Sequence, residues 1–477
     1  MNFKFSSQTT LWLILISIML VRLLFLGAYP LADTTEARYG EMGRLMLETG
    51  DWITPQFEKG VPFWGKPPLS FWFTAASFKI FGIHEFSARL PSFLLGVIII
   101  AMVFSLGQDQ AEKNTALVAC VILASTVIFW ISSGAVMTDH CLLAGTTLSM
   151  VAFWRNMTSD KKAAWIWGHL FFIGLSIGLM AKGPVAAVLV FFPVLSWAII
   201  QKKWRLLVTL PWTTGIVLTA ILTLPWYIAA EIKTPGFLEY FIIGEHWNRF
   251  LVPGWEGDLY GSAHSQPKGM IWGFWLVCAL PWSAFLPYML IKKKIRQSLS
   301  AKVGRSKEWY VYLAVWTVSP MIFFTLAGNI LWAYVLPGIP AFALLAAEVI
   351  QGHPLADKGL LKTSGVILTL FLLVSHIVAF GVGPDKKSQK KMLKYFNGIS
   401  HGETLHYLNR RPFSAEFYSG ATAEEIPLVS GIENLFNDGQ KDYLAVKASR
   451  INNIPEYIKS RFYTKKEING YVLLQEK

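Results

Sequence analysis

The chain has 477 residues, of which 53% are apolar and only 15% are charged. Soluble proteins carry about 25% charged residues, whereas the apolar residues here form long blocks such as 11–26, 116–131 and 184–200. This composition predicts a polytopic membrane protein and excludes a soluble enzyme, a secreted protein and a disordered chain. The net charge of +13 is explained by basic cytoplasmic loops, so we expect no nucleic-acid partner.

The apolar blocks predict about eleven membrane-spanning helices, each of about 20 residues. Their expected centres lie near residues 18, 98, 125, 147, 172, 192, 217, 280, 318, 340 and 372. The first block resembles a signal peptide, but no small-residue cleavage site follows it, so we expect a retained span. Residues 67–83 are apolar but begin with two prolines, and we expect a helix at the membrane interface there.

The positive charges predict the orientation of these spans. With the N-terminus inside, Lys and Arg gather in the inner loops, above all in the cluster that starts at Lys292, as the positive-inside rule requires. An odd number of spans then puts the C-terminus outside. We therefore expect a multi-pass protein of the cytoplasmic membrane with its C-terminus on the outer face.

Two outer loops and a tail complete the predicted organisation. The loops, residues 29–89 and 229–269, are rich in Trp, Pro, Gly and charge, and loops of such length are usually functional. We expect residues 1–383 to form the membrane domain. Residues 384–477 are charged and contain alternating runs at 443–446 and 471–474, which predict a small outer α/β domain.

Ionisable residues gather at one rim of the predicted bundle. A charge at the centre of a membrane helix costs about 2.5 to 3.5 kcal/mol, and a transporter is expected to place such groups at mid-membrane. In this chain they fall at the outer ends of spans and in the outer loops. The rim includes Asp33, Glu36, Arg38, Lys66, Asp139, Lys182, Arg249 and His264.

Four motifs in the first outer loop resemble those of a known family. They are DTTEARYGEM at 33–42, GDWITP at 50–55, GKPPL at 65–69 and FGIHEFSARL at 81–90, and fainter echoes follow later in the chain, among them KGP at 182–184 and EHWNRF at 245–250. The pattern is similar to that of the protein O-mannosyltransferases and aminoarabinose lipid A transferases. It covers most of residues 20–350.

This resemblance implies the GT-C fold and the chemistry of a membrane glycosyltransferase. Such enzymes take a sugar from a polyprenyl-phosphate carrier on the outer side of the membrane, with inversion at the sugar, and pass it to a lipid A-like glycolipid, a glycan or a protein. Two departures bear on the donor. Family members often have Glu at the position of Gly65, and many have Lys at the position of Ile330.

The chemistry of this reaction suggests a role for each rim residue. The phosphate that leaves the sugar gains negative charge and needs fixed cations and donors. Lys66, Arg249 and Tyr334 are the expected phosphate ligands and Lys182 is a weaker one, while Glu36 and Arg38 are expected to bind substrate. If the acceptor is an alcohol, a carboxylate must take its proton, and Asp33 is our candidate.

Asp139 is the second predicted catalytic carboxylate. If it faces Asp33, the two form either an acid with its support or, together with His264, a site for a divalent metal ion. If the acceptor is itself a phosphate, no base is needed, and Asp33 acts through a metal or by orienting the acceptor.

Structural roles compete with each of these assignments. Asp33, Glu36 and Arg38 fit a solvated helix face as well, and Lys66 and Arg249 fit anchors to lipid headgroups. Asp139 fits a helix cap, Lys182 fits a counter-ion to a rim carboxylate, and His246 and His264 fit structural histidines. Two other functional classes also stay open, namely a transporter or flippase for a polyprenyl-linked sugar and a non-catalytic receptor for the same lipid.

Overall fold

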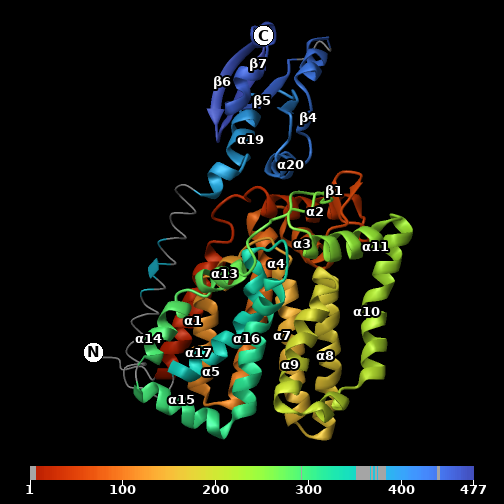
Figure 1. The fold of residues 1–477 in the computed structure, drawn as a ribbon. Coiled ribbons are helices and arrows are strands. Elements are labelled where there is room, and N and C mark those ends of the chain that lie inside the picture. The colour runs from red at the N-terminus through yellow and green to blue at the C-terminus, as the bar shows by residue number, and fades with distance from the viewer. Residues whose placement is uncertain are drawn as a thin grey trace.

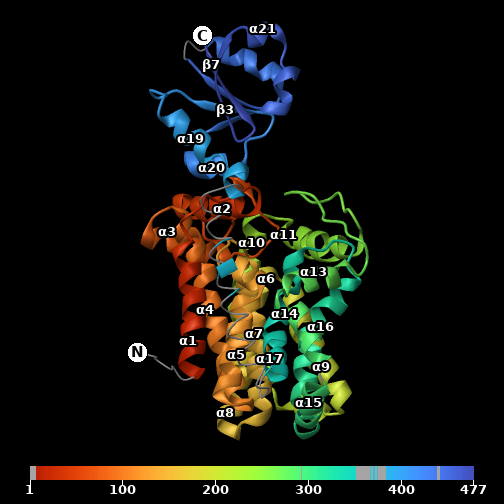
Figure 2. The ribbon, with the colours of Figure 1, turned by 90° about the vertical axis from the view of Figure 1, so that its left-hand side faces the viewer.

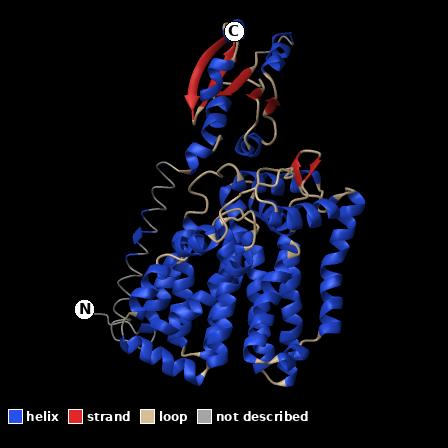
Figure 3. Ribbon diagram, viewed as in Figure 1, coloured by secondary structure: helices blue, strands red, loops and turns tan. Residues whose placement is uncertain are grey.

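The structure, a computed structural model, describes residues 7–291, 293–350, 383–437 and 441–477 and four single positions between 365 and 374. A long helical bundle forms one end of the molecule and a small sheet with short helices forms the other (Figures 1, 2 and 3). The predicted helical membrane fold with a small C-terminal α/β region is therefore confirmed.

Nine of the eleven expected span centres fall on helices of the bundle, the one near residue 280 falls between two consecutive helices, and the one near residue 372 lies outside the described residues. The helices are α1 (Ser7–Leu24), α4 (Glu85–Gln110), α5 (Lys113–Ser125), α6 (Val127–Ser132), α7 (Asp139–Thr158), α8 (Lys161–Lys182), α9 (Val185–Gln201), α10 (Trp212–Lys233), α13 (Met270–Cys278), α14 (Trp282–Leu290), α16 (Lys307–Thr325), η3 (Trp332–Gly338) and α17 (Ile339–Ile350). In the described part of the chain, four stretches are long and apolar enough to cross a membrane alone: 85–110, 161–182, 212–233 and 332–350.

Two of the expected spans are broken rather than continuous. The span near 280 bends by 90° between α13 and α14, because Pro281 lacks an N–H group and its ring cannot continue the preceding helix. The span near 125 breaks at Thr126, between α5 and α6. The breaks meet, since the amide of Val127 donates to the carbonyl of Leu280 at 3.0 Å, which satisfies backbone groups that the membrane could not.

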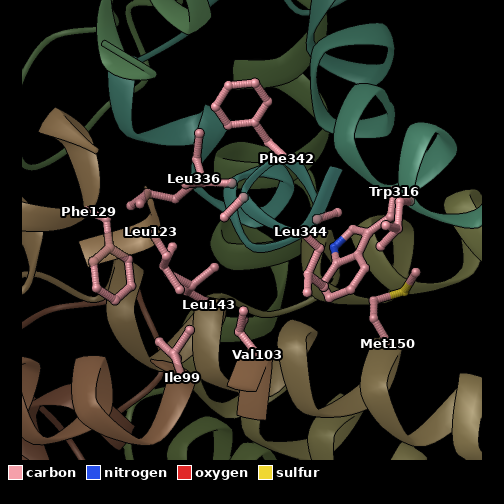
Figure 4. Packing of buried hydrophobic residues seen from close by; sticks show 14 of the residues in the cluster. Ile99, Val103, Leu123, Phe129, Leu143, Met150, Trp316, Leu336, Phe342 and Leu344 are labelled. Carbon is pink, nitrogen blue, oxygen red and sulfur yellow. The ribbon is translucent and has the colours of Figure 1, made fainter. Parts of the chain in front are cut away.

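The bundle packs around a buried apolar core that draws on most of its helices. Figure 4 shows part of it, with Ile99 and Val103 of α4 beside Leu143 of α7 and Leu344 of α17. Glycines bring α7 and α8 close together, since a Cβ atom at Gly145 would lie 2.6 Å from the facing backbone of α8. Close approach over small residues is how helices associate in lipid.

The two outer loops fold over the end of the bundle that faces the C-terminal region (Figures 1 and 2). The first contains α2 (Thr35–Thr49), β1 (Gln56–Glu58), β2 (Val61–Pro62) and α3 (Leu69–Phe81), and the second contains α11 (Phe237–Glu239), the π-helix η2 (Tyr240–Asn248) and α12 (Arg249–Leu251). Helix α3 lies beside α2 at this end, where residues 67–83 were expected. The basic helix α15 (Lys293–Arg305) lies at the opposite end and η1 (Trp204–Thr209) follows α9.

The C-terminal region is a five-stranded mixed sheet with the order β4-β3-β5-β7-β6. The strands are β3 (Leu405–Leu408), β4 (Glu424–Ile426), β5 (Tyr443–Lys447), β6 (Phe462–Ile468) and β7 (Tyr471–Glu476), and the helices are η4 (Pro384–Lys387), α19 (Lys390–Asn397), α20 (Phe413–Ser419), η5 (Val429–Asn437), η6 (Ala448–Asn453) and α21 (Glu456–Lys459). The two alternating runs became β5 and β7, which pair antiparallel at the centre of the sheet.

Candidate active site

A cavity of about 940 Å³ lies at the end of the bundle that faces the C-terminal region, between the helix ends and the loops 29–89 and 229–269, with Arg410 and Phe413 of the C-terminal region at its edge. Eight of the nine predicted site residues line it: Glu36, Arg38, Lys66, Asp139, Lys182, Arg249, His264 and Tyr334. The ninth, Asp33, does not. Residues far apart in the sequence thus share one cavity, as their position at one rim predicts.

Charged side chains from the two outer loops meet in this cavity. Nζ of Lys66 lies 3.4 Å from a carboxylate oxygen of Glu245, and Nη1 of Arg249 donates to both oxygens of that carboxylate at 3.0 Å. Asp258 lies 3.2 Å from the same guanidinium nitrogen. Burial acts to raise the pKa of Glu245, but Lys66 and Arg249 hold that pKa below its usual value. Two cations are therefore held in place by two carboxylates.

Asn329 fixes the backbone beneath Arg249. Its side-chain amide donates to the carbonyls of Arg249 and Val252 at 2.6 and 2.7 Å, and its side-chain oxygen accepts from the amide of Gly254 at 3.0 Å. These bonds tie the end of η2 and α12 to the segment before η3. These three hydrogen bonds therefore fix the direction in which the Arg249 side chain leaves the loop.

Asp139, the first residue of α7, and Lys182, the last residue of α8, form a buried ion pair. Nζ of Lys182 lies 2.7 Å from the carboxylate and 5.4 Å from the centre of the Tyr334 ring. A buried charge that loses its partner is strongly destabilising, so each residue needs the other. Lys182 thus neutralises a rim carboxylate, as the structural alternative expects, while it also lines the cavity.

Glu36 and Arg38 lie on α2 and have structural partners. Glu36 accepts two hydrogen bonds from Arg89 at 2.9 Å and one from the amide of Val136 at 3.2 Å. Burial acts to raise the pKa of Glu36, but Arg89 lowers that pKa overall. Arg38 donates to the carbonyl of Tyr260 at 2.8 Å. Both side chains fix the first outer loop at the cavity wall, and substrate binding by them stays a prediction.

Asp33 lies outside the cavity and contacts the C-terminal region. Its carboxylate accepts hydrogen bonds from the amide of Ser414 at 2.9 Å and from the hydroxyl of the same residue. Burial raises the pKa of Asp33, although both bonds from Ser414 oppose this. The expected pairing of Asp33 with Asp139 is not formed, because Ser414 takes one carboxylate and Lys182 takes the other.

The predicted metal site also lacks its ligands. Among the residues that the structure describes, no three His, Cys, Asp or Glu side chains lie close enough to hold a metal ion. Asp33 and Asp139 have the partners given above. His264 lines the cavity, where burial and the nearby Arg249 lower its pKa. These three residues do not form the expected donor set, so we derive no step through a metal.

A second cavity of about 410 Å³ opens beside the first and is mostly apolar. Its walls come from α9, η2, α16 and η3, with side chains such as Val185, Ile242 and Phe323. The two cavities share seven lining residues: Lys66, Asp139, Lys182, Glu245, Arg249, Ala333 and Tyr334. The charged cluster therefore stands between a polar chamber and an apolar one.

The two departures from the family pattern have local explanations. A Cβ atom at Gly65 would lie 2.8 Å from the Phe63 ring and 3.2 Å from Glu245, so the space beside this glycine already holds a carboxylate. Ile330 is buried, and its amide donates to the carbonyl of His264 at 3.1 Å. A lysine at position 330 would place its ammonium group among buried apolar side chains, so its side chain would have to turn away from this site.

Sequence reasoning missed four residues that shape the cavity. Glu245 stood in a visible motif but was given no role, and Asp258 and Asn329 had no signal beyond their place in loops. Arg22 was hidden inside the first apolar block, where a single Arg in α1 was a detectable signal. All but Asn329 line the polar cavity.

The contact between α20 and α2 buries a further carboxyl group, that of Glu416, whose side chain is 2% exposed. Arg411 lies 2.9 Å from it, and Glu41, Glu58 and Arg44 also face it. Burial, followed by repulsion from Glu41, raises the pKa of Glu416 from 4.5 to about 8. While α20 is packed against α2, the protonated form of Glu416 is therefore favoured.

This carboxyl predicts a pH-dependent stability. Between about pH 4.5 and about pH 8 the folded state keeps a proton that the unfolded state releases, so stability falls as pH rises through this window, by up to about 1.4 kcal/mol per unit. Glu416→Gln is expected to flatten the slope of the unfolding midpoint against pH, whereas Glu456→Gln, at an exposed position, leaves it as in the wild type. An unchanged slope in Glu416→Gln would contradict the assignment.

The fold defines the structural class of the protein: a multi-pass helical membrane protein with the GT-C fold. The structure superposes on that of ArnT from Cupriavidus metallidurans bound to undecaprenyl phosphate with a TM-score of 0.81 over 97% of both chains, at 16% identity. The oligosaccharyltransferase AglB from Archaeoglobus fulgidus gives 0.55 over 92% of this chain and 69% of that one, at 12% identity. At these identities the similarity shows the fold alone.

Sequence comparisons give the family. The profile of the dolichyl-phosphate-mannose-protein mannosyltransferases matches residues 4–241. An undecaprenyl phosphate-alpha-4-amino-4-deoxy-L-arabinose arabinosyl transferase of Enterobacter sp. (strain 638) is 30% identical over 380 residues, which cover 78% of this chain and 65% of the relative. The protein of the same name from Pseudomonas aeruginosa is 29% identical over 387 residues, with 79% and 66% covered.

The chain thus matches just under two thirds of the length of these relatives. It belongs to the family of protein O-mannosyltransferases and aminoarabinose lipid A transferases, as the motifs of its first outer loop predict.

Proposed function

We propose that the protein is a membrane glycosyltransferase that moves a sugar from a polyprenyl-phosphate carrier to a glycolipid, glycan or protein. One observation carries this proposal: an apolar and a polar cavity meet at a charged cluster. A polyprenyl-phosphate sugar has the same three parts, an apolar chain, an anionic link and a polar sugar. The names of the related undecaprenyl phosphate-dependent transferases support the same donor class.

The cluster has the groups that such a transfer needs. As the bond from the sugar to phosphate breaks, charge grows on the phosphate, and Lys66 and Arg249 stabilise it with the Tyr334 hydroxyl as a further donor. The acceptor attacks from the polar cavity, and a single displacement inverts the sugar carbon. For a hydroxyl acceptor a carboxylate must accept the proton. Asp139 already lines the cavity, whereas Asp33 serves as this base only if its contact with Ser414 opens.

The proposal is tested by its product. Mass spectrometry of lipids and surface glycans from cells with and without the gene should show one sugar missing from one glycoconjugate. The purified protein in nanodiscs should then move that sugar, labelled, from the polyprenyl phosphate to the same acceptor. If no glycoconjugate changes and no label moves, the protein is not this enzyme.

A transporter or flippase and a non-catalytic receptor are the rival functions. Both would bind the carrier through the same cavities. A flippase would move a labelled carrier across a proteoliposome without breaking the sugar–phosphate bond, and a receptor would bind it without changing it. Release of free polyprenyl phosphate in the presence of acceptor distinguishes the transferase from both.

We also propose that the cavity and the C-terminal region face the outside of the cytoplasmic membrane. This orientation follows from the positive-inside rule and the odd number of expected spans. Two reporters are fused in turn after Lys477. The one that works only outside the cytoplasm should give a signal, and the one that works only in the cytoplasm should give none. The opposite result would contradict the eleven-span topology.

A further inference from the structure

Arg22 is a buried cation near the outer end of α1. Its side chain is part of the polar cavity lining, and the residue is 4% exposed. Its guanidinium donates to the Tyr29 hydroxyl at 3.2 Å and to the carbonyl of Ile131 at 2.9 Å, and it lies 4.6 Å from the centre of the Trp130 ring. All of these partners are neutral.

No carboxylate balances this charge. Among the residues that the structure describes, no Asp or Glu forms an ion pair with Arg22, and its buried Nε–H has no hydrogen-bond acceptor. Glu36 interacts electrostatically with Arg22, but its carboxylate already accepts hydrogen bonds from Arg89 and from the amide of Val136. A buried, uncompensated charge costs free energy, and an ionisable group within a membrane segment marks a function by default.

Three of the other cavity cations differ in this respect, whereas Arg38 of α2 resembles Arg22: among the described residues it forms no ion pair, and its buried Nε–H has no acceptor. Lys182 has Asp139, and Lys66 and Arg249 share Glu245. The positive charges of the Lys66–Arg249 cluster are therefore balanced by carboxylates before any substrate binds, whereas the region around Arg22 carries a net positive charge. An anion in this part of the cavity would remove the imbalance.

The room for such an anion is the polar cavity of about 940 Å³ that Arg22 lines. The guanidinium itself packs against Gly134, where a Cβ atom would lie only 2.1 Å from it, so Arg22 occupies the space that a side chain at Gly134 would take. A guanidinium has five N–H donors, of which two have partners here. The free donors include Nε–H, and Arg binds phosphate and carboxylate through adjacent N–H groups.

We propose that Arg22 forms a second anion-binding subsite in the polar cavity, separate from the Lys66–Arg249 cluster, which binds a phosphate or carboxylate group of the acceptor. This inference rests on the proposed function and deepens it, because it requires the acceptor to carry an oxyanion. The donor phosphate occupies the cluster and the acceptor anion occupies the Arg22 subsite, so the two substrates are held apart by charge.

The test measures how many anions bind to the purified full chain in phosphatidylcholine nanodiscs. Undecaprenyl phosphate first saturates the donor site, and equilibrium dialysis then measures binding of radiolabelled inorganic phosphate. We expect the wild type to bind one further phosphate, and Arg22→Gln to weaken it about 10- to 100-fold, the loss typical of charge-assisted hydrogen bonds. Arg22→Lys, which keeps a cation and guards against a folding defect, should retain part of the affinity.

Two variants separate the subsites. Lys66→Met should weaken undecaprenyl phosphate but leave the second phosphate in place. Arg155→Gln removes another arginine that lies over a Trp ring, 4.5 Å from Trp167 and paired with Asp109, and should change neither. Absence of a second phosphate in the wild type, or an unchanged affinity in Arg22→Gln, would overturn the subsite. Failure of undecaprenyl phosphate to bind would instead count against the proposed function.

Competition identifies the source of the anion. Phosphatidic acid in the nanodisc and glucose 6-phosphate in solution each compete for the labelled phosphate if they reach Arg22. Competition by the lipid alone indicates an acceptor that enters from the bilayer, and competition by the sugar phosphate alone indicates one that enters from water. If neither competes, Arg22 does not bind an acceptor anion and the proposal fails.

Discussion

Lys66→Met is expected to lower both donor affinity and turnover, the latter by about 10² to 10³, the loss typical of one electrostatic stabiliser. Methionine keeps much of the stem and deletes only the cation. Nζ of Lys66 lies 3.4 Å from Glu245 and also donates to the carbonyl of Gly65 at 2.5 Å, and the residue lines both cavities. Pro67 and Pro68 restrict the backbone that follows, so the ammonium is aimed at the junction of the cavities.

The control is Lys79→Met in α3, an exposed lysine of the same outer loop that lacks the proline frame. Transfer is measured with purified protein at several donor concentrations. Lys66→Arg should be only partly tolerated, because the guanidinium fork is broader than an ammonium and needs two oxygens in line. Equal, small effects of the two methionine variants would mean that Lys66 anchors the loop to lipid headgroups and that Arg249 holds the phosphate.

Asp33→Asn is the second change with a large expected effect, a loss of about 10² to 10⁴ in turnover if Asp33 is the general base. Asparagine keeps the shape and can still accept from the amide of Ser414, so expression and thermal stability should stay close to those of the wild type. The measurement is turnover with a hydroxyl acceptor. An Asp33→Asn protein with wild-type turnover would remove this carboxylate from the mechanism.

Ser414→Ala separates the two roles of Asp33. It deletes the hydroxyl that donates to the carboxylate but leaves the carboxylate itself intact. If Asp33 is the base, Ser414→Ala should cost little turnover or even raise it, because the carboxylate is less firmly held. A loss in Ser414→Ala as large as that in Asp33→Asn would show that Asp33 acts by docking the C-terminal region.

The sequence predicts where most helices of the bundle lie because hydropathy reports directly on transfer into lipid. It does not predict the bend at Pro281, because proline restricts a backbone without fixing its new direction. It also does not predict that this bend meets the break at Thr126, which depends on a contact between residues about 150 positions apart in the chain.

The candidate site was predictable in part because charged side chains near a membrane are costly and are therefore found mainly where they have a function. That argument brings Lys66, Asp139 and Arg249 to one rim, and the cavity contains all three. It cannot give the partner of each charge, since pairing depends on distances in the fold. Asp33 was expected in the cavity but holds Ser414 instead, 381 positions away in the sequence.

The size of the apolar cavity bears on how the protein would read its lipid. About 410 Å³ is near the lower end of the range that encloses a drug-sized molecule, and a long polyprenyl chain is far larger. Under the proposed function, only the isoprene units next to the phosphate lie within the protein, and the remainder stays in the bilayer. Selection among carriers would then depend on the saturation and geometry of those first units, and carriers that share them but differ in total length would be equivalent substrates.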